Sequence, residues 1–175
     1  MAALLMAGCS KKKSNDVIIT SKVEKPAVSK TPVRMSAWSN TWNVTWGGGN
    51  YRIDISRQPD DSLAMVKDET GQTFVDNRIT LRISRDDGSV FLTKTFTKAL
   101  FSQYLNNDYM ATGILEGLVF DEVDDGLLEF AASVSHPQTD EYIPLELKIS
   151  RMGDISIKRD SQMDTNSDTG DDDDD

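Results

Sequence analysis

The side chains of this sequence that could do acid–base, nucleophilic or metal chemistry are not spaced as a catalytic set. His136 is the only histidine, and it precedes Pro137 and a polar loop, so we expect a solvent-exposed loop histidine rather than a general base or zinc ligand. Ser-His-Asp, Cys-His and zinc hydrolase chemistries therefore have little to build on. No nucleophile elbow, P-loop or dinucleotide-binding fingerprint occurs. We predict no catalytic residue, no metal site and no cofactor.

A carboxylate pair is the main catalytic alternative. Glu116 and Glu129 fall on neighbouring predicted strands and could supply the acid and base of a glycan hydrolase. Any acidic protein offers such pairs, so this stays an alternative to a noncatalytic role.

Three acidic or amide residues near the C-terminus have the spacing of a calcium loop. Asp164, Asn166 and Asp168 fit its first positions, but Gly170 is one place late for an EF-hand and no flanking helix is indicated. Residues 160–175 contain eight acidic residues and no basic one, and with Met163 as their one apolar residue they cannot bury enough surface to order themselves. We predict a disordered acidic tail over 160–175.

Three tryptophans at even spacing could form an aromatic platform for a sugar ring. Trp38, Trp42 and Trp46 would line up along one strand, with Tyr51 beside them, and these four are the candidate ligand-binding residues. Trp42 and Trp46 share their face with Val44, which favours a place in the core for both. Trp38 is then the tryptophan expected to be exposed.

The strand pattern continues through the body of the chain. Apolar residues alternate on both sides of residues 47–50, and pairing across this four-residue loop sets Trp46 opposite Tyr51, Val44 opposite Ile53 and Trp42 opposite Ile55. Three more hairpins are predicted, with turns at residues 86–89, 124–126 and 151–153.

One short helix is expected near residues 97–106. Thr97 would be its N-cap, and Asn106 with Asn107 would end it. The fold class is therefore mainly β: an antiparallel meander of about eight strands that forms a barrel or a sandwich, with the barrel favoured.

Size and charge limit the organisation and the partners. A chain of 175 residues suits one domain, which we place at residues 36–159, preceded by a flexible tether over 10–35 that is rich in Lys, Ser and Pro. The net charge is −10, so the domain would repel nucleic acid, and we predict no nucleic-acid partner.

The N-terminus suggests a lipid anchor. Residues 1–7 are apolar, and Met6-Ala7-Gly8-Cys9 resembles the lipobox of bacterial lipoproteins, so residues 1–9 are interpreted as the remnant of a signal peptide. The resemblance implies lipidation of Cys9 and a membrane as partner. Ser10 resembles residues that do not retain a lipoprotein at the inner membrane, so we expect an outer-membrane anchor in the cell envelope, facing the periplasm.

Several short motifs resemble a family of uncharacterised lipoproteins from gut anaerobes of the Bacteroidetes type, a domain of unknown function. The resemblance covers roughly residues 40–158 and implies no activity. Its motifs are Gly47-Gly48-Gly49-Asn50-Tyr51, Asp76-Asn77, Arg85-Asp86-Asp87-Gly88-Ser89, Phe96-Thr97-Lys98 and Gly113-Ile114-Leu115-Glu116-Gly117.

Three functions remain open at this point. The first is a noncatalytic, membrane-tethered module of the cell envelope that binds an envelope protein or a glycan. The second is a lipocalin-like carrier of a small apolar ligand, which needs an internal cavity. The third is the glycan hydrolase that would use Glu116 and Glu129.

Overall fold

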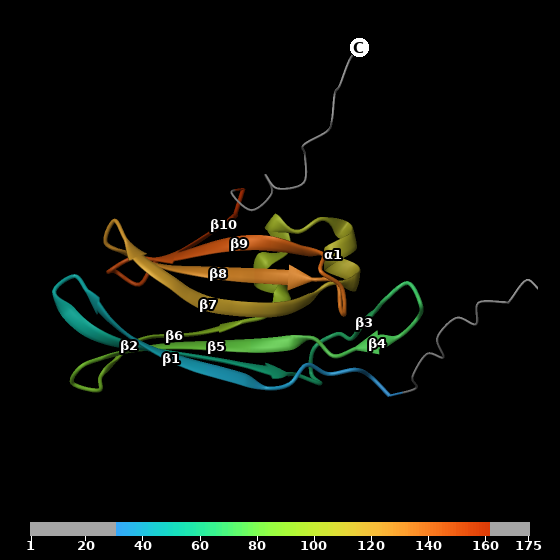
Figure 1. The fold of residues 1–175 in the computed structure, drawn as a ribbon, viewed down its shortest axis with the longest axis horizontal. Coiled ribbons are helices and arrows are strands. Elements are labelled where there is room, and N and C mark those ends of the chain that lie inside the picture. Colours follow the sequence, from blue (N-terminus) through green and yellow to red (C-terminus); the bar gives the residue numbers. More distant parts are fainter. Residues whose placement is uncertain (1–30, 162–175) are drawn as a thin grey trace, which may run out of the picture.

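The strands form two four-stranded antiparallel sheets that lie face to face (Figure 1). The computed structural model describes residues 31–161. Sheet 1 has the strand order β1-β2-β5-β6 and contains β1 (Trp38–Trp46), β2 (Gly49–Pro59), β5 (Asn77–Arg85) and β6 (Val90–Phe96). Sheet 2 has the order β10-β9-β8-β7 and contains β7 (Ile114–Asp124), β8 (Leu127–Ser135), β9 (Tyr142–Ile149) and β10 (Ile155–Arg159). The predicted mainly β, antiparallel class is confirmed.

The two sheets share one hydrophobic core. Alternate residues of each strand point inward, as Ile53 and Ile55 do from β2 and Leu145 and Leu147 from β9, and all four are almost completely buried. The ladders stop at the edge strands β1, β6, β7 and β10 within the described residues, so the sheets do not close on each other. The arrangement is a sandwich, and our preference for a barrel was wrong.

The first hairpin has a tighter turn than its sequence suggested. Gly47 and Gly48 alone connect β1 to β2, both with positive φ (57° and 83°), so Trp46 pairs with Gly49 and Val44 with Tyr51. The register is therefore two residues away from the predicted one. Because side chains alternate with period two, this shift leaves every apolar side chain on its predicted face.

The other three hairpins agree with the sequence pattern. The turn after Arg85 includes Gly88 at φ 81°, the turn of the β7–β8 hairpin consists of Asp125 and Gly126, and the last hairpin pairs Ile149 with Ile155.

Two short helices, rather than one, connect the sheets. A 3₁₀ helix, η1 (Lys98–Tyr104), follows Thr97 and buries Phe101 in the core. A separate α-helix, α1 (Asn107–Thr112), begins where the predicted helix was expected to end, because the Asn106 side chain accepts a hydrogen bond from the Tyr109 amide. The asparagine that we interpreted as a terminator is an N-cap.

The ordered part of the domain begins before residue 36. Val33 forms a bridge with Phe74 of the small β3–β4 hairpin (β3, Val66–Lys67; β4, Thr73–Phe74), and Met35 packs against the same apolar cluster. The last residues of the predicted tether therefore lie against the domain. The rest of the tether, Cys9 and residues 162–175 of the predicted acidic tail lie outside the described residues.

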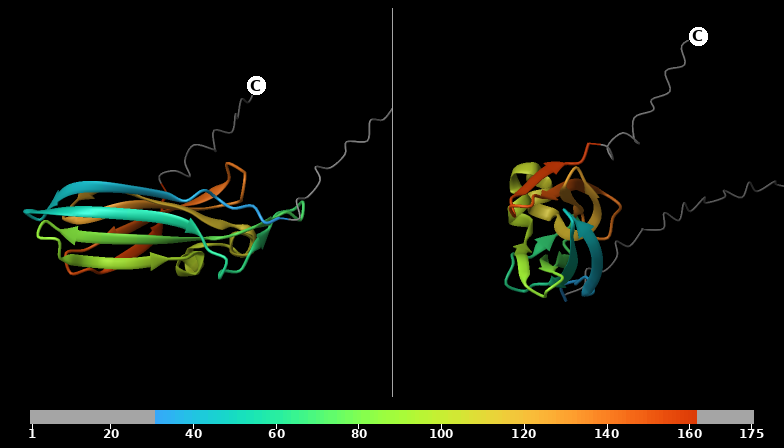
Figure 2. Two further views of the ribbon diagram at one scale, coloured as in Figure 1. Left: turned by 90° about the horizontal axis from the view of Figure 1, so that it is seen from below. Right: turned by 90° about the vertical axis from the view of Figure 1, so that its left-hand side faces the viewer.

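The sandwich has two distinct ends (Figures 1 and 2). The turns of the four long hairpins (β1–β2, β5–β6, β7–β8 and β9–β10) lie at one end, which we call the hairpin end. The β3–β4 hairpin, α1 and the β8–β9 connection lie at the other, the loop end, and Thr31 is hydrogen-bonded to Gln72 of the β3–β4 hairpin. None of the helices in residues 31–161 has the length and apolarity to span a membrane.

Candidate binding site

The predicted tryptophan platform does not exist as a flat exposed surface. Trp46 is 1% exposed, its ring packs edge-on against Tyr51 and Phe91 at 5.1 and 5.3 Å, and its Nε1 donates a hydrogen bond of 2.8 Å to the Gly126 carbonyl. Trp46 therefore joins the two sheets at the hairpin end and cannot stack on a ligand.

Trp38 and Trp42 occupy the side of the sandwich where the edge strands β1 and β7 meet. Both are half-buried against the core, with ring centroids 6.3 Å apart, and Trp42 lies 6.2 Å from Phe120. Trp38 is less exposed than we expected because its ring leans on Trp42. The two rings are tilted by 53°, so they cover the core and offer a sugar no coplanar surface.

The two glutamates of the hydrolase hypothesis lie far apart. Glu116 accepts a hydrogen bond from the Ser135 hydroxyl, whereas Glu129 pairs with Lys148 on the outer face of sheet 2. Ser135 and Glu129 are six residues apart along β8, or about 20 Å, while glycosidase carboxyl groups lie about 5–10 Å apart. These two residues do not form a catalytic pair.

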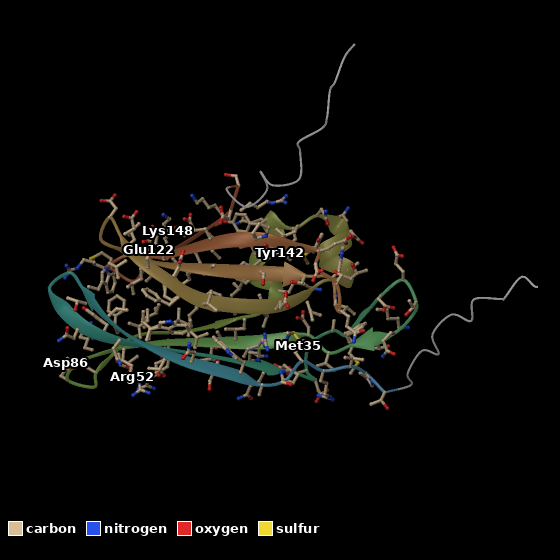
Figure 3. All side chains as sticks on the ribbon, in the orientation of Figure 1. Met35, Arg52, Asp86, Glu122, Tyr142 and Lys148 are labelled. Carbon is tan, nitrogen blue, oxygen red and sulfur yellow. The ribbon has the colours of Figure 1, made fainter. Side chains whose placement is uncertain are left out.

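The outer face of sheet 1 carries a different candidate. Polar side chains form most of the cross-strand rows there: Ser39, Ser56, Thr80 and Thr95 in one row, then Thr41, Asp54, Arg82 and Thr93, then Asn43, Arg52 and Ser84, with Val90 of β6 at the end of the third row. Figure 3 shows Arg52 pointing away from sheet 2. The face therefore offers closely spaced hydroxyl, amide and guanidinium groups without a lysine or a glutamate in these rows.

A hollow of about 650 Å³ opens in this face towards the hairpin end. We call it the sheet 1 groove. Tyr51 is the one predicted ligand-binding residue that lines it. The outward-facing and turn residues around it are Asn43, Thr45, Asn50, Arg52, Asp54, Arg82, Ser84, Arg85, Asp86 and Gly88.

One carboxylate organises the charges of the groove. Asp54 Oδ1 accepts hydrogen bonds from Thr41 Oγ1 at 2.6 Å and from Arg52 Nε at 2.9 Å. Partial burial opposes ionisation of Asp54, but these hydrogen bonds and the charges of Arg52 and Arg82 outweigh it and lower the pKa of Asp54. The carboxylate is therefore ionised at neutral pH and holds Arg52 in place.

The groove carries more positive than negative charge, although the protein is acidic. Arg52, Arg82 and Arg85 face only Asp54 and Asp86 among its lining residues. Arg82 forms no direct ion pair within residues 31–161. Its Nε donates a hydrogen bond of 3.4 Å to Ser84 Oγ, and Asp54, the residue opposite it on β2, is already paired with Arg52. Arg82 is thus available to an anion.

A second hollow, of about 500 Å³, lies at the loop end around His136. The imidazole stacks on Tyr109 with centroids 4.0 Å apart; Nδ1 lies 2.9 Å from Glu141 Oε2, and Nε2 lies 3.0 Å from Asp108 Oδ2. The His136 side chain is only 19% exposed, so the expected solvent-exposed loop histidine was wrong. Its partners come from α1 and from the far side of its own loop, which no local pattern revealed.

A buried polar cluster lies at the loop end, and three of the motifs noted in the sequence meet in it. Asp76 Oδ1 accepts hydrogen bonds from the amides of Asn77 (2.7 Å) and Leu115 (2.8 Å), and Lys98 donates one to the Gly113 carbonyl (2.6 Å). These contacts tie the starts of β5 and β7 to the end of β6. The motif residues Asp76-Asn77, Thr97-Lys98 and Gly113–Gly117 therefore have a structural explanation.

Neither a metal site nor an internal ligand cavity emerges from the described residues. No three His, Cys, Asp or Glu side chains within residues 31–161 are placed to hold a metal ion. Buried side chains from both sheets and from η1, including Leu81, Phe101 and Phe130, pack together between the sheets, whereas the hollows above are lined mostly by loop or outward-facing residues. A carrier of the lipocalin kind would need its cavity in that filled space.

Comparison with known proteins adds one finding. A family model described as "Domain of unknown function (DUF4738)" matches residues 18–157. No curated protein matches the chain.

Proposed function

The chain belongs to the DUF4738 family, a domain of unknown function, and from this premise we propose that it is a noncatalytic binding module of the cell envelope, tethered to a membrane through lipid on Cys9. The proposed binding site is the sheet 1 groove, and the proposed location is the periplasmic side of the outer membrane.

One observation carries this proposal: the groove and the start of the domain lie towards opposite ends of the sandwich. The Thr31 carbonyl accepts a hydrogen bond from Gln72 of the β3–β4 hairpin at the loop end, whereas Arg85, Asp86 and Gly88 of the groove belong to the hairpin end. A lipid on Cys9 would therefore attach the domain to the bilayer from its loop end, and the predicted flexible tether would leave the groove near the opposite end accessible to a partner.

A noncatalytic role is supported by the partners of the candidate acids and bases. Glu116 is held by Ser135, Glu129 by Lys148, and His136 by two carboxylates and a stacked tyrosine. Each group is occupied in a contact within the protein, and no two of them converge on the groove.

Cell fractionation tests the tether. Wild type is expected in the membrane fraction with an N-terminal peptide whose mass includes acyl chains on Cys9, and Cys9→Ser is expected in the soluble fraction, because each buried methylene contributes about 0.8 kcal/mol to membrane affinity. An unmodified Cys9 in soluble wild-type protein would overturn the anchor.

Crosslinking on intact cells tests the binding role. A photoreactive residue placed at Ser84, in the groove, should capture envelope material that the same residue placed at Ser156 of β10 does not. Equal capture at both positions, or none at Ser84, would count against the groove as the binding site.

A further inference from the structure

We propose that the sheet 1 groove binds a carboxylate-bearing sugar chain, with Arg82 and Arg52 contacting the carboxylate. The proposal rests on the binding role given above and names the chemistry of its ligand. Three features of the groove lead to it: its surplus positive charge, the arrangement of its hydroxyl and amide groups, and the charge of the molecule around it.

The surplus positive charge of the groove predicts that the bound part of the ligand carries one anionic group. Asp54 lies across from Arg82 in the β2–β5 ladder and accepts two contacts from Arg52 Nε, at 2.9 and 3.1 Å, so one carboxylate serves two guanidinium groups. The terminal nitrogens of Arg52 and of Arg82 can donate hydrogen bonds to a further acceptor, while Arg82 Nε donates to Ser84 Oγ. A planar guanidinium binds a carboxylate through two parallel hydrogen bonds, which gives direction as well as charge.

The surrounding side chains suit a polyhydroxylated ligand. Asn43, Thr45, Asn50 and Ser84 line the groove beside the arginines, and each can both donate and accept a hydrogen bond. They come from three adjacent strands, so their spacing is set by the sheet and is about 5 Å from strand to strand. A rigid sheet holds these groups in place before a ligand binds, so little ordering entropy is lost on binding.

The charge of the whole protein argues against a denser polyanion. The net charge is −10, and Asp86 lines the groove at the hairpin end. A nucleic acid, with one charge per phosphate on each strand, would meet this negative field over most of its length. A uronic-acid chain carries one charge per sugar unit or fewer, so its carboxylate can reach Arg82 while its neutral groups contact the hydroxyl rows.

The test is titration of the full chain with two polymers of similar size, oligogalacturonate and neutral dextran, by calorimetry at low and at 0.5 M salt. We expect binding of oligogalacturonate that weakens with salt, and no heat with dextran. Arg82→Gln should weaken oligogalacturonate binding by about tenfold, because a charge-assisted contact is lost. Arg159→Gln removes the same charge from β10 and should leave binding unchanged.

Arg82 is exposed on the outer face, so its replacement should not prevent folding, and circular dichroism of both variants checks this. Equal binding of the two polymers, or equal loss in Arg82→Gln and Arg159→Gln, would overturn the role of the carboxylate. Binding of neither polymer would overturn the sugar ligand, whereas the tether and the capture at Ser84 are decided by their own measurements.

Discussion

Lys98 Nζ lies 3.9 Å from Asp76 Oδ2, and the two side chains are 11% and 5% exposed. Burial raises the pKa of Asp76 against the effect of its backbone hydrogen bonds and of Lys98, and burial lowers the pKa of Lys98 against the effect of Asp76. Each charged group of the pair therefore stabilises the charged form of the other against the effect of burial. The pair also connects β5, β6 and β7, on which both sheets depend.

Removing one partner of this pair should be costly. Lys98→Met leaves the Asp76 carboxylate without its cation and the Gly113 carbonyl without its donor, so we expect unfolding free energy to fall by about 3 kcal/mol at pH 7. The double variant with Asp76→Asn should lose less than the sum of the single variants. Denaturant unfolding measures all three, with exposed Lys67→Met as the control.

The pH dependence gives a second check on the same variant. A carboxyl whose pKa is raised on folding stabilises the fold below its unfolded pKa of 3.8, and this contribution is lost as the pH rises through the raised folded value. Without Lys98, whose charge lowers the pKa of Asp76, the stability lost as the pH rises is greater. The stability difference between wild type and Lys98→Met should thus shrink as the pH falls towards 4, and a constant difference would contradict the assignment.

Trp46 and Trp38 should respond differently to truncation. Trp46→Ala removes a completely buried ring that is hydrogen-bonded to Gly126, so we expect a loss of about 3–5 kcal/mol. Trp46→Phe keeps part of the packing and should lose about 1–2 kcal/mol. Trp38→Ala, which removes a half-buried ring, should cost less than half as much as Trp46→Ala. Equal losses in chemical denaturation would mean that Trp38 is also a core residue.

The strands were predictable because their faces and turns are local properties. Alternation placed Trp46 and Ile53 inside, and Asp125-Gly126 marked a turn. The register of the first hairpin was not determined, since Gly47-Gly48-Gly49-Asn50 allows a two-residue or a four-residue loop without changing any face. The alternation of side chains does not show which strands pair across an intervening loop. The pairing of β2 with β5 was therefore not predictable from it.

The candidate groove required the pairing of distant strands. Asn43, Arg52 and Arg82 are ordinary outward-facing residues in the sequence, and only the order β1-β2-β5 makes them neighbours. The surroundings of His136 were missed for the same reason, because Tyr109 and Asp108 belong to α1, a second helix that the sequence pattern did not predict. Sites assembled from several segments are fixed by topology, which composition does not encode.

Asp60 should contribute to the loss of stability in acid. Hydrogen bonds from the Ser62 hydroxyl and amide, with an ion pair from Arg78 at 2.5 Å, lower the pKa of Asp60 from 3.8 to about 2. A lowered pKa means stability that is present above pH 3.8 and is lost as the pH falls towards 2. Asp60→Asn should therefore flatten the decline in thermal midpoint over this window. Exposed Asp140→Asn, in the β8–β9 connection, is the control, and an equal effect of both variants would refute the prediction.

His136 should hold α1 against the β8–β9 connection. His136→Ala removes the stack on Tyr109 and the contacts with Glu141 and Asp108, and it leaves two carboxylates facing a gap. We expect a loss of about 1–2 kcal/mol in unfolding free energy. The amides of α1 should exchange with deuterium faster, while those of the Asp125-Gly126 turn at the hairpin end should not change.

His136→Phe separates the two parts of this interaction. Phenylalanine can stack on Tyr109 but donates no hydrogen bond to either carboxylate, so exchange in α1 should fall between wild type and His136→Ala. Glu141→Gln keeps the stack and weakens only the Nδ1 contact, and it should resemble wild type more closely. If His136→Ala leaves exchange in α1 unchanged, the helix is held by its Asn106 cap and its backbone alone, and the stacked ring contributes nothing to its position.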